Sequence, residues 1–126
     1  MSHQHHYRVG VEWTGNRGSG TDGYRNYGRD HVIRIDGKPA VDGSADPTFH
    51  GDAARLNPED MLVSALSACH MLSYLHMATV AGVVVTAYTD VAEGNMVTDG
   101  DSGRFVEVVL HPVVTISVAS DPAKAK

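Results

Sequence analysis

An uncharged, apolar run in the middle of the chain limits the folds that this sequence can adopt. The run follows Asn57-Pro58-Glu59-Asp60 and continues to Ala81 without an aspartate, glutamate, lysine, arginine, glycine or proline. Asparagine caps helix N-termini, proline suits the first helical position, and the two acids complement the helix dipole. Gly82 provides a left-handed C-terminal stop. The pattern therefore predicts one helix over residues 58–81, roughly 36 Å long.

Small and apolar side chains surround this predicted helix on nearly all sides, so it has to be buried almost everywhere. Its length is adequate for a membrane span. However, basic anchors are missing at both ends, the flanks have soluble-strand patterns, and polar residues interrupt the run, namely Ser64, Ser67, His70, Ser73 and His76. We therefore expect a core helix and no membrane. Because a chain of 126 residues can hardly cover such a helix alone, the sequence predicts a homodimer.

Composition and charge narrow the class of protein. The length fits a single domain, and 42% hydrophobic residues suffice for a core. Ten Lys and Arg against fifteen Asp and Glu give a net charge of −5, whereas a nucleic-acid binder needs a basic surface. The one cysteine, Cys69, cannot form an internal disulfide, and the N-terminus lacks a signal-peptide pattern. We expect a cytoplasmic protein with a free thiol and no nucleic-acid partner.

Strand patterns precede the predicted helix. Residues 7–13 and 31–35 alternate apolar with polar side chains, which is typical of half-buried strands. Residues 21–27 predict another strand, and residues 39–57 read mostly as loop. The glycine-rich loop over residues 14–20 has no helix directly after it, so it does not match a phosphate-binding fingerprint.

Two β-rich stretches follow the predicted helix, over residues 83–93 and 104–120. They predict an antiparallel hairpin that is joined by a turn-rich connection over residues 95–103. The order of strands, helix and strands predicts an α+β fold. Asp121 and Pro122 then start a helix-like pattern that ends with the chain, so we expect residues 1–126 to be one domain without its last helix.

Cys69 stands near the middle of the predicted helix. A cysteine in such a place is most often a small core residue. His76 is about two turns further along the same stripe, too far for the two to share a metal ion, and mid-helix placement provides no oxyanion hole for a cysteine protease. The tract His3, His5 and His6 reads as a solvated tail. No metal and no cofactor are predicted.

The residues around Cys69 resemble the OsmC/Ohr family of osmotically induced and organic-hydroperoxide-resistance peroxidases. Asn57-Pro58-Glu59-Asp60 with Cys69 ten residues after Glu59 is similar to the family's Asn-Pro-Glu and Ala-x-x-x-Cys signature. Trp13-Thr14-Gly15, Gly18-Ser19-Gly20-Thr21 and the strand pair after the helix extend the similarity over most of the chain. The resemblance implies an OsmC-like fold in which two chains intertwine, with antiparallel strands around a long central apolar helix.

The resemblance also implies a mechanism. Cys69 would be the peroxidatic thiolate that attacks the O–O bond of an organic hydroperoxide and becomes a sulfenic acid. An arginine would keep the sulfur ionised, and Glu59 would orient that arginine by a charge-assisted hydrogen bond. Glu59 lies about 15 Å from Cys69 along the helix axis, so it could serve the cysteine only through such a bridging group.

The position of the activating arginine differs between branches of the family. Arg17, in Thr14-Gly15-Asn16-Arg17, matches the arginine of the organic-hydroperoxide-resistance branch. The osmotically induced branch supplies it from the loop before Asn-Pro-Glu, where this chain has Thr48-Phe49-His50-Gly51. Arg29 and Arg55 are the alternatives.

The family's resolving cysteine has no counterpart among these 126 residues. Either the chain stops before the family's C-terminal helix and strand, which the ending at Asp121-Pro122 favours, or the protein is a one-cysteine variant. A truncated chain would need an external small-molecule or protein dithiol for turnover. The expected function is thus a thiol-dependent peroxidase for organic hydroperoxides in oxidative-stress defence. The alternative is a dimeric OsmC-fold protein that binds a small molecule without peroxidase turnover.

Overall fold

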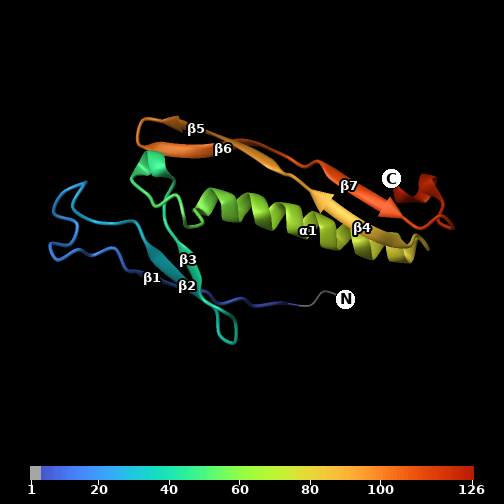
Figure 1. Cartoon of the computed structure of the whole chain (residues 1–126), viewed down its shortest axis with the longest axis horizontal. Helices are drawn as coiled ribbons and strands as arrows, with labels where there is room; N and C mark the ends of the chain where they lie inside the picture. The colour runs from blue at the N-terminus through green and yellow to red at the C-terminus, as the bar shows by residue number, and fades with distance from the viewer. Residues whose placement is uncertain (1–3) are drawn as a thin grey trace. The chain divides into compact units, whose positions relative to one another are not determined.

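Seven strands, one long α-helix and two short 3-10 helices make up the described part of the chain (Figure 1). The computed structural model describes residues 4–126, so His3 of the histidine tract lies outside it. The chain divides into two compact units, Met1–Asp60 and Met61–Lys126, and each is described by itself. The elements confirm the predicted α+β class, with antiparallel strands and one long helix.

A three-stranded antiparallel sheet of order β1-β2-β3 forms the first unit. It comprises β1 (Gly10–Trp13), β2 (His31–Arg34) and β3 (Val41–Gly43). The strands predicted at residues 7–13 and 31–35 are confirmed in these shorter forms. Strand β3 and the 3-10 helix η1 (Pro47–Phe49) lie in the stretch over residues 39–57 that the sequence predicts to be mostly loop. The sequence does not indicate them, because three residues are too few to show a period.

The strand predicted over residues 21–27 is wrong, since this segment forms consecutive turns. Its polar side chains form short-range hydrogen bonds, and the backbone does not pair with another strand. The Asp22 carboxylate accepts hydrogen bonds from Ser19 Oγ at 3.1 Å and Asn26 Nδ2 at 3.0 Å, and the Asn26 amide donates to the Gly23 carbonyl at 2.9 Å. Such short-range bonds compete with strand pairing.

Helix α1 (Pro58–Val80) confirms the predicted helix within one residue at its C-terminus. Asn57 caps its start, because the Asn57 side-chain oxygen accepts the Asp60 amide at 2.8 Å. At the other end Gly82 has a φ of 79°, which lets Gly82 N bond Thr79 O at 3.1 Å and Val83 N bond Ala78 O at 2.8 Å. This pair of bonds is the Schellman motif, so the signals read from the sequence are the ones that end the helix.

Replacing Asn57 with alanine should lower the free energy of unfolding by about 1 kcal/mol, because the first turn of α1 then loses its side-chain acceptor. Urea denaturation followed by circular dichroism measures the change. Asn57→Asp is the matched control, since it keeps an acceptor at the cap and should stay close to the wild-type value. An equal loss in both variants would show that the cap is not the cause.

The second unit contains two antiparallel strand pairs. They follow one another as one long ribbon that runs along α1 (Figure 1). β4 (Val85–Asp90) pairs with β7 (Pro112–Ile116), and β5 (Glu93–Asp99) pairs with β6 (Ser102–Val109). The predicted hairpin is confirmed, but the turn-rich connection over residues 95–103 is wrong. Most of it is ladder, and only Gly100, at a φ of 63°, and Asp101 form the turn.

The helix is mostly exposed in the described chain, so the expectation that it is buried almost everywhere is wrong for this chain alone. Ala78 is its only buried residue, whereas Leu72, Met77 and Val80 are 61–69% exposed. Among the described residues α1 is long and apolar enough to cross a membrane by length and composition, a test that core helices of soluble proteins also pass. The described chain therefore leaves a large apolar helix surface exposed.

The chain ends in the 3-10 helix η2 (Pro122–Ala125). Asp121 caps it as the sequence suggests, because its carboxylate accepts the Ala123 amide at 3.0 Å. The Tyr74 hydroxyl on α1 donates a hydrogen bond to the Ala125 carbonyl. The last residues are thereby held against the helix.

Candidate functional site

Cys69 lies in the middle of helix α1 with its side chain exposed. His70 and His76 on the same helix are exposed as well. Two cavities include sequence neighbours of Cys69 in their linings, but Cys69 itself lines neither of them. An exposed thiol on a rigid helix is accessible to a small reagent, which a core cysteine would not be.

Asp90, at the end of β4, connects the strand ribbon to α1. Its two carboxylate oxygens accept a hydrogen bond from Ser67 Oγ at 2.6 Å and another from the His111 amide at 2.6 Å. The hydrogen bond from Ser67 is the main reason why the pKa of Asp90 is lowered from its usual 3.8, and His111 and His70 act in the same direction. Asp90 is thus held as a carboxylate.

Replacing Asp90 with asparagine should flatten the acid limb of the stability profile. A carboxyl whose pKa is lower in the folded state stabilises that state above the unfolded value of 3.8, and this contribution disappears as the pH falls through the folded value. Urea midpoints measured between about pH 6 and about pH 2 should therefore fall less steeply in Asp90→Asn than in the wild type. Asp99→Asn, at the end of β5, is the control, and an acid limb of wild-type steepness in Asp90→Asn would contradict the assignment.

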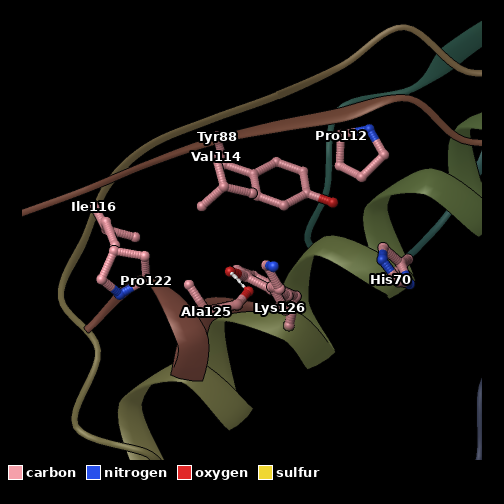
Figure 2. Close-up of a pocket in the computed structure, with 9 residues that line it drawn as sticks. His70, Tyr88, Pro112, Val114, Ile116, Pro122, Ala125 and Lys126 are labelled. Carbon is pink, nitrogen blue, oxygen red and sulfur yellow. Dashed lines mark hydrogen bonds between the residues drawn. The ribbon is translucent and has the colours of Figure 1, made fainter. Parts of the chain in front are cut away.

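A largely apolar cavity of about 660 Å³ lies between α1, the β4–β7 pair and η2 (Figure 2). Its lining residues are His70, Tyr74, Tyr88, Pro112, Val114, Ile116, Pro122, Ala125 and Lys126. The Tyr88 hydroxyl is buried and has no hydrogen-bond partner among the described residues. Burial first, and then Asp90 and Tyr74, raise the pKa of Tyr88 above its usual 10.0, so the hydroxyl remains a donor.

A second cavity, of about 510 Å³, belongs to the first unit and brings together the two predicted arginines. Arg17 and Arg29 both line it, together with Arg25, Tyr27, His50 and Gly51. Gly15 and Gly28 hold the surrounding loops together, since the Gly28 amide donates to the Gly15 carbonyl at 2.8 Å. A Cβ on Gly15 would lie 2.0 Å from the Gly28 carbonyl oxygen, so this contact requires glycine.

The two predicted arginines differ in what they contact. Arg29 donates to the carbonyls of Tyr27 at 2.6 Å and Tyr24 at 2.8 Å, and its guanidinium lies 3.8 Å from the centroid of the Tyr27 ring. These contacts make Arg29 an organiser of its own loop. Arg17 lies close to Gly28 and has no hydrogen-bond or ion-pair partner among residues 4–126. Arg17 is therefore the free guanidinium of the pair.

Arg55, the third alternative, is engaged in a network of acids. Its guanidinium lies 3.6 Å from the Asp30 carboxylate and 3.9 Å from those of Asp42 and Asp52, and it donates to the His31 carbonyl at 3.3 Å. These contacts link β2 and β3 to the segment before α1. Arg55 thus has a structural role that leaves it little capacity for another partner.

Glu59 stands in the first turn of α1, as predicted. Its Oε2 atom is buried and has no hydrogen-bond partner within the described residues, and no arginine of this part of the chain forms an ion pair with it. A buried carboxylate oxygen without a partner is costly, so this atom is poised to accept a hydrogen bond that residues 4–126 do not donate.

Comparison with known proteins agrees with this fold. A family model described as OsmC-like protein matches residues 50–126, more than half of the chain. A structure of an OsmC-like protein of unknown function from Vibrio cholerae is 30% identical, with a TM-score of 0.84 over 94% of this chain and 80% of that one. An OsmC-like protein from Mycoplasma pneumoniae shares the fold, at 15% identity and a TM-score of 0.69 over 97% and 76% of the two chains. No curated protein matches the sequence.

The structure thus defines an α+β protein with an exposed cysteine on its long helix. The chain belongs to the OsmC-like family. Sequence reasoning missed Arg25, His50 and Tyr88, although Tyr24-Arg25-Asn26-Tyr27 does place an arginine between tyrosines in the sequence. That pairing of aromatic and guanidinium groups is the one signal that could have indicated the cavity in advance.

Proposed function

We propose that this protein is a thiol-dependent peroxidase that reduces organic hydroperoxides, with Cys69 as the peroxidatic residue. The observation that carries the proposal is the exposed Cys69 ten residues after Glu59, on the long helix of an OsmC-like fold. A thiol in this position is accessible to a small substrate, and the helix fixes its direction. No metal is needed for this chemistry, and the residues that the structure describes contain no cluster of three possible metal ligands.

The reaction consumes one thiolate for each peroxide. The Cys69 sulfur attacks the terminal oxygen of the hydroperoxide, the O–O bond breaks, and its electrons leave with the alkoxide, which takes up a proton to become an alcohol. The sulfur is oxidised to a sulfenic acid and the peroxide is reduced. A dithiol then restores the cysteine, because one of its thiols displaces water from the sulfenic acid and the other releases Cys69 by disulfide exchange.

We assign supporting roles in the proposed reaction to Arg17, Arg29 and Glu59. Arg17 is our choice for the group that keeps the thiolate charged and polarises the peroxide, since its guanidinium has no other partner in the described chain. Arg29 positions the same loop through its bonds to the Tyr24 and Tyr27 carbonyls. The unpartnered Glu59 oxygen is suited to orient an arginine by a charge-assisted hydrogen bond.

We further propose that the protein acts as an intertwined homodimer in the cytoplasm. Helix α1 carries exposed leucine, methionine and valine side chains that a second copy of the same helix would cover. The peroxidase would then defend the cell against oxidative stress with a cellular dithiol as reductant. The free thiol supports cytoplasmic placement, because a reducing compartment preserves exposed thiols.

Oxidation of Cys69 by one equivalent of cumene hydroperoxide tests the proposal directly. We expect the thiol to be lost stoichiometrically and a sulfenic acid to be trapped on Cys69, as seen by thiol titration and mass spectrometry with a sulfenic-acid probe. Dithiothreitol should restore the thiol. A thiol that reacts no faster than free cysteine would contradict the peroxidase.

The second candidate is a small-molecule binding protein of the same fold that has no peroxidase turnover. The cavity of about 660 Å³ with its buried Tyr88 hydroxyl favours it. Saturable binding of an apolar ligand that is unchanged in Cys69→Ser, together with no peroxide consumption by the wild type, would support this candidate over the first.

A further inference from the structure

The cavity of the first unit has an unusual concentration of positive charge. Three of its six lining residues are arginines, and no carboxylate lines it. The whole chain carries a net charge of −5, so this arrangement runs against the overall composition. Three guanidinium groups around one hollow repel each other, and an anion between them would offset this repulsion.

The acids nearest in sequence have other partners. Asp22 accepts hydrogen bonds from Ser19 and Asn26, and Asp30 and Asp52 lie 3.6 Å and 3.9 Å from Arg55. Neither Arg17 nor Arg25 has a hydrogen-bond or ion-pair partner in the part of the chain that the structure describes. Their donors are therefore available to a ligand.

Arg29 holds the loop that lines the cavity in a defined conformation. Its guanidinium lies 3.8 Å from the Tyr27 centroid and 5.1 Å from that of Tyr24, and its two donated hydrogen bonds fix the carbonyls of both tyrosines. Arg25 lies between these two tyrosines in the sequence and is carried by the same loop. A neutral anchor could hold the loop equally well, but a cation here adds to the positive field of the hollow.

His50 also lines the cavity. Its backbone has a φ of 66°, a conformation that non-glycine residues rarely adopt, and the His50 amide donates to the Pro47 carbonyl at 3.1 Å. The ring packs edge-on against Tyr24, with centroids 5.4 Å apart. The strained backbone thus holds an imidazole at the cavity, where it offers a further donor.

From this arrangement we infer that the cavity binds an oxyanion, the carboxylate or phosphate group of a small molecule. Arg17 and Arg25 provide forked donors for two of its oxygens, His50 a third donor, and Arg29 the supporting charge. The glycine-rich loop over residues 14–20 contributes the side chain of Arg17 to this cavity. This agrees with the sequence, in which the loop does not match a P-loop whose backbone amides bind phosphate. The site shares Arg17 with the proposed peroxidase, but oxyanion binding requires no thiol.

Titration of the full chain with inorganic phosphate and with acetate, each against sodium chloride at equal ionic strength, tests the site. NMR signals of the arginine side chains and of Trp13, the one tryptophan, report on it, because Trp13 contacts Tyr27 and donates to the Gly28 carbonyl at 2.8 Å. We expect saturable shifts in at least one titration and a Kd raised about fivefold or more in Arg25→Gln. Arg25→Lys should lose less, because it keeps the charge.

Arg34→Gln is the matched control, since Arg34 belongs to the same unit, pairs with Glu12 at 3.4 Å and does not line the cavity. It should bind like the wild type. Tighter phosphate than acetate binding assigns phosphate monoesters, and the reverse assigns carboxylates. Shifts that do not saturate, or that weaken equally in Arg25→Gln and Arg34→Gln, would overturn the inference. Cys69→Ser should bind like the wild type, so failure of the peroxidase and failure of this site are distinguishable.

Discussion

Cys69→Ser should lose about 10³-fold or more of the rate at which the protein consumes organic hydroperoxide with a dithiol, because a serine hydroxyl does not supply the nucleophilic thiolate. The substitution changes one exposed atom on α1, so folding should be preserved. Peroxide consumption is measured by the loss of cumene hydroperoxide in a coupled or direct assay, with circular dichroism to confirm the fold.

Ser73→Ala is the matched control for this experiment. Ser73 is an exposed small residue one turn beyond Cys69 on the same helix, so its replacement perturbs the helix surface without removing the thiol. Its rate should stay within about twofold of the wild type, as is usual for surface substitutions. Equal rates in Cys69→Ser and the wild type would show that the peroxide is not reduced by this cysteine.

Leu72→Asp should prevent the proposed homodimer. Leu72 is 62% exposed on α1, and a second copy of the helix would bury it. An unpaired carboxylate buried in an apolar interface costs several kcal/mol, and a symmetric dimer contains two of them, so the dimer Kd should rise about 10³-fold or more. Size-exclusion chromatography with light scattering over a range of protein concentrations measures the shift from dimer to monomer.

Val118→Asp adds the same charge at a fully exposed position in the turn after β7, which is not part of the helix. We expect this control to remain a dimer. A wild-type protein that is monomeric at all concentrations would contradict the dimer outright, and a Leu72→Asp protein that remains dimeric would show that α1 is not in the interface.

The features of the fold that the sequence predicts best are those whose signals act locally. Asn57 and Gly82 end the helix through hydrogen bonds to backbone groups a few residues away, so their effect can be read without knowing the rest of the structure. The burial of the helix is different. It depends on what packs against α1, and within the described chain Ala78 is the one helix residue that is buried.

The errors come from polar residues in exposed strands. Residues 95–103 contain the asparagine, aspartate and glycine residues of a typical turn, yet β5 and β6 are almost wholly exposed, so such side chains are tolerated in the ladder. In the first unit the reverse occurs, since Asp22 and Asn26 turn a strand-like stretch into consecutive turns. Local propensity cannot separate these two outcomes.

For the candidate site, the motif that begins at Asn57 placed Cys69 and Glu59 on one helix, and the structure has both there. Spacing could not show that Arg17, Arg25 and His50 would line one cavity, because His50 comes from a segment far from the stretch that carries both arginines. Their roles stay predictions.

The rate of the first oxidation step tests the central proposal most directly. Stopped-flow mixing of the reduced protein with cumene hydroperoxide, and separately with hydrogen peroxide, follows the loss of the one thiol, Cys69. The proposed peroxidase predicts a fast, stoichiometric reaction that prefers the organic peroxide and is absent in Cys69→Ser. A rate no greater than that of free cysteine, with no preference between the two peroxides, would contradict it.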